Sequence, residues 1–400
     1  MNLAKRAISP ALPDPAEFSA LLERVHHLGR AVVAVHADSV DRDARFPSEA
    51  FDALKAEGLL SCYVPLEYGG MGLDVRQISA ICEALGHYCA STAMVFAMHQ
   101  IQVACIVHHA LGSAFFRDYV RAIATQQYLI ASATTELGIG GDVRSSLCAV
   151  RVVDHHFILE KQAPVISYAE AADAILVTCR RAEDAARSDQ VQVLVRKEDC
   201  TLRRLSGWDT LGFRGTCSPG FELKSLGHIE QILPMPYAFI HGKTMHPFAH
   251  IVWASLWLGL ASDALNRARS AVRAEARKNP DAAPISATRL AEADIVLNSM
   301  RACVQAAVTE YHRLLENGDP EAFANFGFAI RINNLKISCS QSVIDIVCRA
   351  MMICGIAGYR NDSKLSLGRH LRDATGAALM VNNDRILGQN ATMHVGVRDT

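Results

Sequence analysis

One stretch decides the fold of this chain, namely Leu129-Ile130-Ala131-Ser132-Ala133-Thr134-Thr135-Glu136-Leu137-Gly138-Ile139-Gly140-Gly141-Asp142. Its first five residues have the pattern of a strand, and the glycines that follow permit a turn. Before this stretch, from residue 16 to about 125, apolar residues recur every three or four positions, as in amphipathic helices. After it, short β-type runs separated by turn residues recur as far as residue 223, with the spacing of a small antiparallel β unit. The sequence period therefore changes from helix to strand at about residue 126.

The chain returns to a helical period from Pro247 onward. Residues 251–274 and 290–316 each carry a long apolar face, and a third helical pattern covers residues 333–354. No GxGxxG or phosphate-binding loop opens a helix after a strand, which argues against a Rossmann fold. We therefore predict an α+β multidomain protein. Its domains are expected over residues 1–125 (all helical), 126–240 (β) and 241–400 (helical).

The composition of the chain limits the classes of partner that it is expected to bind. Half of the 400 residues are hydrophobic, so the chain can bury two or three packed units and an intersubunit face. Forty Lys and Arg against 41 Asp and Glu leave a net charge of −1, without the basic excess of nucleic-acid-binding proteins. No apolar run is expected to span a membrane, and no apolar segment follows Met1 to Arg6 as in a secretory signal. We expect neither nucleic acid nor a membrane as a partner.

Twelve cysteines are scattered along the chain, and none forms a Cys-x-x-Cys pair. Neither a zinc site nor a disulfide framework is therefore expected. Buried, unpaired cysteines are typical of proteins kept in a reducing compartment. The pattern predicts a cytoplasmic protein without a metal centre.

Four motifs, in the same order and over nearly the whole chain, resemble those of the acyl-CoA dehydrogenase superfamily. They are Val64 to Gly72, similar to the family's Pro-x-x-Tyr-Gly-Gly-x-Gly; Thr135 to Asp142, similar to its Thr-Glu-Pro-Gly-x-Gly-Ser-Asp; Leu211 to Thr216, closing on Phe221-Glu222-Leu223; and Gly358-Tyr359 followed by Arg372-Asp373. The resemblance implies an all-α N-terminal domain, a middle antiparallel β-barrel-like domain and a C-terminal four-helix bundle. It also implies a homo-oligomer, either a dimer or a tetramer.

The resemblance further implies a flavin between the β domain and the C-terminal helices, with an acyl thioester against its ring. FAD is the implied cofactor, and FMN is the alternative because several anchors of the adenine half differ. The positions that the resemblance assigns to the flavin are Thr134, Thr135, Gly140, Gly141, Val165, Ser167, Arg273, Asn382 and Asn383. An ordinary β-turn and strand is the alternative interpretation of the segment around Thr135.

Several of these positions depart from the family. Val165 stands where the family has a tryptophan near the flavin ring, and Ser167 where it has the threonine that bonds toward N5. Arg273 lies in a helix end without the family's Arg-x-x-Phe-Gly, so a solvated helix end is the alternative there. Asn382 and Asn383 replace a Gly-Thr pair, and their amides can donate hydrogen bonds.

The segment from Arg372 to Ile386 resembles the place where the family carries its catalytic glutamate. Counted from Arg372-Asp373, that glutamate falls on Val381. Desaturation of a thioester needs a positioned base for the weakly acidic α-proton. Val381 has no proton-accepting side chain, so the family's usual reaction is in doubt.

Three residues are candidates to act in the absence of that glutamate. His250 lies at the start of the first long C-terminal helix and is the nearest titratable group. Asp384 follows Val381 by three residues, on nearly the same face if the segment is helical. His99 is a candidate to line the substrate pocket. Each has a structural alternative, namely a packed helix histidine, an ion pair with Arg385 and a hydrogen-bonded core histidine.

Two functions of different class follow. The first is a flavin-dependent oxygenase or oxidase that uses O2, because loss of the glutamate removes desaturation and Val165 opens the N5 face of the ring. The second is an acyl-CoA or acyl-carrier-protein α,β-dehydrogenase with a non-standard base. A flavin-holding protein without turnover is a third interpretation. The sequence leaves open whether the substrate is a free small molecule or a CoA thioester.

Overall fold

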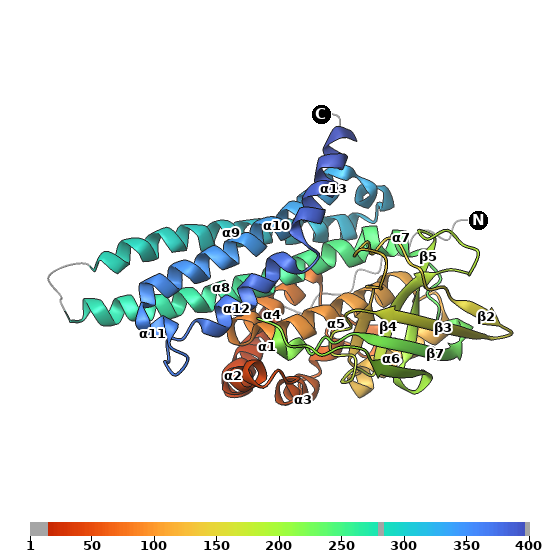
Figure 1. Cartoon of the computed structure of the whole chain (residues 1–400), viewed down its shortest axis with the longest axis horizontal. Helices are drawn as coiled ribbons and strands as arrows, with labels where there is room; N and C mark the ends of the chain where they lie inside the picture. Colours follow the sequence, from red (N-terminus) through yellow and green to blue (C-terminus); the bar gives the residue numbers. More distant parts are fainter. Residues whose placement is uncertain (1–14, 279–283, 397–400) are drawn as a thin grey trace.

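The computed structural model describes residues 15–278 and 284–396. Expectations about the first residues of the chain, including the absence of a secretory signal, lie outside this range. The described chain runs as helices, then two small sheets, then long helices, so the predicted class is confirmed (Figure 1). Helix gives way to strand between Gln126 and Ile130, and strand to helix between Gln231 and Tyr237.

The N-terminal third is helical and contains α5 (Ala90–His109). This helix is apolar nearly all round, and 89% of its most apolar window is buried inside the protein, as the sequence predicts. A capping box between Asp74 and Gln77 begins α4. The other segments are α1 (Pro15–Leu28), η1 (Gly29–Val33), α2 (Ala34–Arg42), α3 (Ser48–Ala56), η2 (Leu59–Ser61), η3 (Leu66–Tyr68), α4 (Val75–Tyr88) and α6 (Ala114–Gln126).

The middle third forms two sheets. In the first, of order β1-β4-β5, β1 (Ile130–Ala133) runs parallel to β4 (Ala174–Arg180), which pairs antiparallel with β5 (Gln190–Arg196). The parallel β1–β4 pair, with an isolated parallel bridge between Ala149 and Arg180, departs from the antiparallel pattern expected from the sequence. The second sheet, of order β2-β3-β7-β6, is antiparallel throughout. Its strands are β2 (Arg151–Val153), β3 (His156–Ala163), β6 (Cys200–Arg204) and β7 (Phe221–His228), and the short turns of this domain are η4 (Lys197–Asp199), η5 (Arg214–Thr216) and η6 (Ile229–Gln231).

The C-terminal third is led by three long helices that pack side by side (Figure 1). They are α8 (His246–Ala276), α9 (Ile285–Asn317) and α10 (Phe326–Cys354). A short connection joins α8 to the β domain. It consists of α7 (Tyr237–Ile240) and the π-helical turn η7 (His241–Met245). Within it, Met245 Sδ accepts a hydrogen bond from Tyr237 at 3.3 Å. The remaining segments are η8 (Pro320–Ala324), α11 (Ile356–Tyr359), α12 (Gly368–Leu379) and α13 (Asn383–Gly396).

Two glycines allow the N-terminal and C-terminal thirds to pack backbone against backbone. A side chain at Gly86 of α4 would collide with the carbonyl of Leu256 in α8. A side chain at Gly259 of α8 would collide with the carbonyl of Glu83 in α4. The close approach therefore requires glycine on both helices, and it fixes the start of α8 against the helical domain.

The expectation that no apolar run reaches the length of a membrane span is wrong when helices are judged by their length and composition alone. Three helical segments of the described chain are long and apolar enough, namely α5, the segment Tyr237–Ala276 and α10. Inside the protein, 89% and 83% of the apolar windows of the first two are buried, so their hydropathy reflects core packing. Only 33% of the window in α10 is buried, so much of this apolar segment is left uncovered by the residues that the structure describes.

Candidate active site

The helix that was expected to continue through the glutamate position is broken there. α12 ends at Leu379 and α13 begins at Asn383, and Val381 between them has a φ of +42°. This left-handed conformation is strained for a β-branched residue. Asn382 Oδ1 accepts a hydrogen bond from the backbone N–H of Asp384 at 2.8 Å and so begins α13.

The break corrects the prediction for Asp384. That prediction placed Asp384 on the same helix face as Val381, but no continuous helix connects the two residues. The side chain of Asp384 is exposed, and Arg385 donates to the carbonyl of Gly140 rather than to Asp384. Asp384 therefore does not replace the missing carboxylate in this conformation.

A buried lysine of α10 contacts the break, and the sequence analysis missed it. Lys336 Nζ donates to the carbonyl of Val381 at 3.3 Å and to Asn383 Oδ1 at 2.7 Å. Asn383 in turn donates from Nδ2 to Ser340 Oγ at 3.0 Å. Burial lowers the pKa of Lys336 to about 8. The available sequence signal was a lysine between Leu335 and Ile337 in an otherwise apolar helix.

Three histidines at the start of α8 form a second part of the site. The ring centroids of His241 and His246 lie 5.5 Å apart and nearly parallel, and those of His246 and His250 lie 4.5 Å apart and edge to face. Their ring nitrogens meet α10, since His246 Nε2 lies 2.8 Å from Asn333 Oδ1 and His250 Nδ1 lies 3.3 Å from the carbonyl of Ile332. The sequence analysis identified only His250 of this cluster.

The contacts of His250 assign its tautomer. A carbonyl oxygen only accepts hydrogen bonds, so Nδ1 of His250 carries the proton that is donated to Ile332. Nε2 then holds a lone pair, which is what a base needs. Burial, with the nearby His246, holds the pKa of His250 well below its usual value. His250 is therefore neutral and able to accept a proton, but it is a weak base in this environment.

The whole histidine cluster is uncharged. Burial, together with the charges of His246 and Arg144, lowers the pKa of His241 to about 3. Burial also lowers the pKa of His246, despite its hydrogen bond to Asn333. At neutral pH the cluster thus offers neutral rings rather than cations.

A chain of amides connects this cluster to α13. Asn333 Nδ2 donates to Asn390 Oδ1 at 2.8 Å, and Asn390 Nδ2 donates to Asn334 Oδ1 at 2.9 Å. Because Asn333 gives its amide protons to Asn390, its oxygen faces His246. α8, α10 and α13 are therefore fixed to one another by polar side chains that the sequence analysis did not single out.

The glycine-rich turn of the β domain lies against α13. Arg385 Nη2 donates to the carbonyl of Gly140 at 2.8 Å, and a side chain at Gly141 would lie 3.2 Å from Arg385 Nη1. Gly140 and Gly141 have φ of 59° and 79°, which other residues rarely adopt. Arg385 Nη1 is buried without a hydrogen-bond partner among the described residues. It is a donor available to a ligand.

The predicted flavin residues Thr135, Val165 and Ser167 lie close together in the β domain. Thr135 Oγ1 donates to the carbonyl of Val165 at 2.8 Å, so the Thr135 hydroxyl can only accept from a ligand. Ser218 Oγ donates to Ser167 Oγ at 2.8 Å, which leaves the Ser167 proton free to be donated. Thr134 and Val165 are half-buried.

We call the break between α12 and α13, with the turn at Gly140 and Gly141 and the hydroxyls of Thr135 and Ser167, the junction. Two other predicted residues lie apart from it. His99 is buried, accepts from the N–H of Ile130 at 3.0 Å through Nδ1 and donates to the carbonyl of Leu60 at 2.7 Å. Both ring nitrogens are thus used, and His99 is a core histidine rather than a pocket-lining group. Arg273 is exposed in the last turn of α8, at the end farthest from the β domain (Figure 1). Within one chain it cannot meet the other predicted flavin residues.

The Arg372-Asp373 pair binds the neighbouring domains rather than Asp384. Arg372 forms an ion pair with Asp41 of α2. Asp373 is buried and accepts a hydrogen bond from the backbone N–H of Phe213 at 2.7 Å. The motif therefore fixes the helix that leads to Val381 against both other domains.

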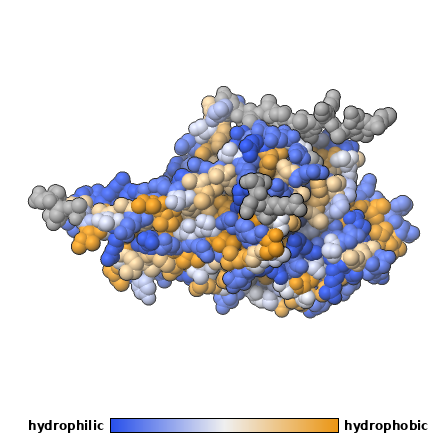
Figure 2. Space-filling model, turned by 90° about the horizontal axis from the view of Figure 1, so that it is seen from above, coloured by the Kyte–Doolittle hydropathy of each residue, from blue (hydrophilic) through white to orange (hydrophobic). Residues whose placement is uncertain are grey.

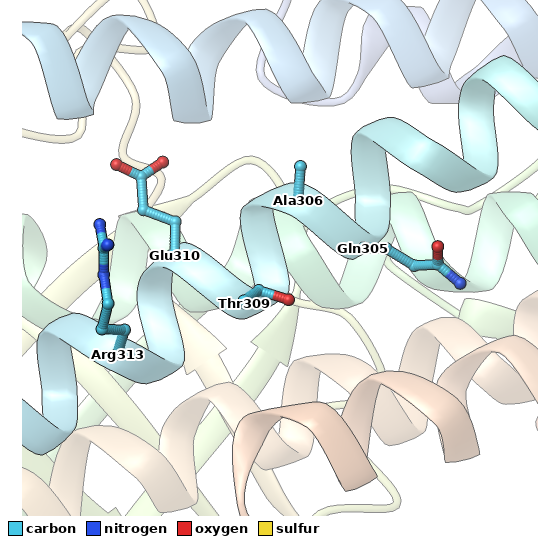
Figure 3. Close-up of a pocket in the computed structure, with 5 residues that line it drawn as sticks. All are labelled: Gln305, Ala306, Thr309, Glu310 and Arg313. Carbon is cyan, nitrogen blue, oxygen red and sulfur yellow. The ribbon is translucent and has the colours of Figure 1, made fainter.

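Two surface hollows lie elsewhere. The larger has a volume of about 410 Å³ and is lined by five residues of one face of α9 (Figure 3): Gln305, Ala306, Thr309, Glu310 and Arg313. A second, of about 290 Å³, lies in the β domain beside Glu170, Lys197 and Cys200. Neither includes a residue of the junction described above, and the described residues contain no group of three His, Cys, Asp or Glu that could hold a metal ion.

The polar groups of the junction fit a flavin. A flavin needs donors and acceptors along its pyrimidine edge and at N5, and the Ser167 hydroxyl, the Thr135 oxygen and the free Nη1 of Arg385 supply both kinds. The glycines of the turn let the backbone approach a ligand closely.

Comparison with known proteins identifies the family. Residues 15–127 match the family described as acyl-CoA dehydrogenase, N-terminal domain, and residues 247–381 match acyl-CoA dehydrogenase, C-terminal domain. The chain is 24% identical over 378 residues to cyclohex-1-ene-1-carbonyl-CoA dehydrogenase of Syntrophus aciditrophicus, covering 92% of this chain and 86% of that protein. It is 23% identical over 349 residues to dibenzothiophene monooxygenase of Rhodococcus qingshengii, covering 80% of this chain and 81% of that protein.

Solved structures share the fold. FMN-bound TdsC from Paenibacillus sp. A11-2 has a TM-score of 0.82 at 18% identity, over 95% of this chain and 98% of that chain. Butyryl-CoA dehydrogenase from Megasphaera elsdenii has a TM-score of 0.79 at 19% identity, over 94% and 98%. Fold, motifs and family matches agree, and the chain belongs to the acyl-CoA dehydrogenase superfamily of flavin-dependent oxidoreductases.

Proposed function

We propose that this protein is a flavin-dependent oxygenase or oxidase that uses O2 as co-substrate. The observation that carries the proposal is the break between α12 and α13. There Val381 takes the place of the family's glutamate, and the ammonium of Lys336 lies against its carbonyl. A site that holds a cation where relatives hold a carboxylate is unsuited to α-proton abstraction and suited to a developing negative charge.

The residues of the chain have defined parts in this proposal. A bound flavin, once reduced by an external donor such as NAD(P)H, supplies electrons to O2. Lys336 and Arg385 provide positive charge near the junction, which stabilises oxygen as it gains negative charge. Ser167 donates a hydrogen bond, and the rings of His246 and His250, which are neutral, add no charge to the site.

The positions of two carboxylates also favour the oxygenase proposal over the dehydrogenase. Asp384 is exposed, and Glu136 is already engaged by the N–H groups of Leu147 and Cys148 at 3.0 and 2.6 Å. Glu136 also pairs with the buried ammonium of Lys161 at 3.7 Å. Neither carboxylate is placed to act as the dehydrogenase base.

The second candidate is a thioester α,β-dehydrogenase that uses His250 as its base. The free lone pair on His250 Nε2 is the observation in its favour, and one relative of similar identity is named as a CoA-ester dehydrogenase. The strongly lowered pKa of His250 weighs against it, because a weaker base removes an α-proton more slowly. The substrate class, a free small molecule or a CoA thioester, differs between the two candidates.

We also propose that the chain works as a cytoplasmic homo-oligomer with FAD or FMN bound. The long helices α8, α9 and α10, with α11, form an arm of the molecule (Figure 1). Exposed apolar side chains occur on this arm, among them Ile295 (67% exposed), Met352 (69%) and Ile356 (72%). Figure 2 shows apolar side chains interspersed with polar ones along this arm. Such surface is costly to leave in water, and a second copy would cover it. The twelve free thiols agree with a reducing compartment.

An anaerobic experiment tests the choice between the candidates. The purified flavoprotein is mixed first with acyl-CoA esters and then, separately, with NAD(P)H or dithionite, while the flavin spectrum is recorded. The oxygenase proposal expects no bleaching by acyl-CoA, followed by fast reoxidation of the chemically reduced protein on admission of O2. Bleaching by an acyl-CoA alone, with formation of the enoyl product, would refute it.

A further inference from the structure

Lys336 is a buried cation without a partner of opposite charge. Its side chain is fully buried, and no carboxylate among the described residues forms an ion pair with it. The other fully buried lysine, Lys161, shows the usual arrangement, since its ammonium pairs with Glu136 at 3.7 Å and donates to the carbonyl of Thr178 at 2.6 Å. A buried charge without a counter-charge is costly and is retained where it serves a ligand or a reaction.

The hydrogen bonds of Lys336 leave part of its capacity unused. An ammonium carries three N–H donors. Two point to the carbonyl of Val381 and to Asn383 Oδ1, and no third acceptor contacts Nζ among the residues that the structure describes. Ser340 and Asn383 hydrogen-bond each other at 3.0 Å and hold the acceptor side of this arrangement in place.

The groups that face Lys336 from the neighbouring helices are neutral. α13 contributes the amide of Asn383, and α10 contributes the hydroxyl of Ser340. From α8, His250 lies close enough that the positive charge of Lys336 helps to lower the pKa of that imidazole. The histidines therefore do not neutralise Lys336, and among the described residues its charge is met by the oxygens of Val381 and Asn383.

We propose that Lys336 is the anion-binding group of this site, and that its Nζ pairs with a negatively charged oxygen of the ligand. Two sources would present the same chemistry, namely a carboxylate or phenolate of the substrate and O2 as it takes up electrons. Val381, through its strained backbone, and Asn383 are positioning residues that hold the ammonium. The proposal rests on the proposed flavin-dependent function and adds the charge that its ligand carries.

The test compares the flavin-loaded protein with three variants. Lys336→Met removes the charge and keeps most of the volume, Lys336→Arg keeps the charge, and Lys243→Met is the matched control. Lys243 is half-buried, and its ammonium lies over the rings of Phe239 and Phe323 at 5.9 and 5.8 Å. Thermal unfolding of each flavin-loaded variant establishes that it is folded before binding is measured.

Two measurements separate the sources of the anion. The first is calorimetric titration of the oxidised protein with benzoate and with benzamide, which have nearly the same shape but differ in charge. We expect wild-type protein, Lys336→Arg and Lys243→Met to prefer benzoate by about tenfold or more, and Lys336→Met to lose this preference. The second is the rate at which O2 reoxidises the reduced protein, expected to fall by about a hundredfold in Lys336→Met alone.

Each outcome decides the proposal. Loss of the benzoate preference in Lys336→Met supports a substrate anion, and slower reoxidation alone supports O2 as the source of charge. If Lys336→Met matches wild-type protein in both measurements, or if Lys243→Met changes as much, the proposal is overturned. A wild-type protein that prefers benzoate but reoxidises no faster than free flavin would refute the O2-using function while leaving Lys336 as the anion-binding group.

Discussion

Lys336 Nζ donates a hydrogen bond to the main-chain carbonyl of Val381 at 3.3 Å, across 45 positions of sequence. The contact joins the middle of α10 to the break between α12 and α13. The left-handed backbone of Val381 and the buried ammonium therefore belong to one arrangement, at the position where the family carries its glutamate. The proposal of an O2-using flavoenzyme rests on that pair.

Replacing Val381 by Asn is expected to stabilise the protein by about 1 kcal/mol. Asn tolerates a positive φ, whereas a β-branched residue is strained there. Val381 is 43% exposed, so little burial is lost. Urea unfolding of the flavin-loaded protein measures the change. Leu379→Asn, at an exposed helical position, is the control and should stabilise nothing; equal effects of both substitutions would contradict the strain argument.

Replacing Val381 by Glu is expected to give a measurable but low thioester desaturase activity. The substitution restores a carboxylate at the family's position, although the nearby ammonium of Lys336 would hold it as an ion pair and weaken it as a base. Formation of enoyl-CoA under anaerobic conditions is the measurement. The double variant Val381→Glu with Lys336→Met should be more active than the single one. No activity in either would mean that the pocket, and not one side chain, prevents desaturation.

Removing the carboxylate of Asp373 is expected to cost about 1 to 3 kcal/mol, because the backbone N–H of Phe213 would be left buried without an acceptor. Asp373→Ala tests this in urea unfolding. Asp373→Asn is the matched control, since its amide oxygen can still accept the bond. If the two variants are equally stable, the hydrogen bond is not the stabilising contact.

Stability should rise with pH in the alkaline range because of Lys336. Burial lowers the pKa of Lys336 to about 8 from 10.5. Between these values the unfolded chain keeps a proton that the folded chain has released, so the free energy of unfolding increases with pH in this window. Lys336→Met lacks the effect. Relative to Lys336→Met, the wild-type protein should gain free energy of unfolding as the pH rises from 8 to 10.5, and parallel curves would show that folding does not lower the pKa of Lys336.

Acid should destabilise the fold through His99. Burial lowers the pKa of His99 to about 4 from 6.5. As the pH falls from 6.5 toward 4, the unfolded chain takes up a proton that the folded chain refuses, so stability is lost over that interval. His99→Gln removes the titrating group and should flatten this part of the stability curve, at the cost of lower stability at neutral pH. An unchanged acid slope in the variant would assign the loss to other groups.

The order of helix, sheet and helix could be predicted because each period is local to its own segment. The burial of α5 followed from apolar residues all round that helix, and the turn at Gly140 and Gly141 followed from its glycines. The same locality explains the errors. The prediction put Asp384 on the same face as Val381 by assuming one continuous helix. The residues around Val381 do not predict that the helix ends there.

The candidate site was only partly predictable. The β-domain hydroxyls were predicted from family motifs, and His250 from its place at the start of the first long C-terminal helix. His241, His246 and Lys336 were missed, because a histidine or a lysine acquires its role only from groups that lie far away in the chain. The core role of His99 depends in the same way on Leu60 and Ile130.

The sequence by itself determined the fold class and the family, and it predicts that Val381 stands where the family carries its glutamate. These depend on period, on motif order and on the identity of one residue, and each can be read without knowing what lies nearby. Tertiary structure alone decided that a cation occupies the neighbourhood of that missing carboxylate and that the histidines beside it are neutral. Charge and basicity at a buried site are set by desolvation and by partners from distant segments, and only the folded chain brings those together.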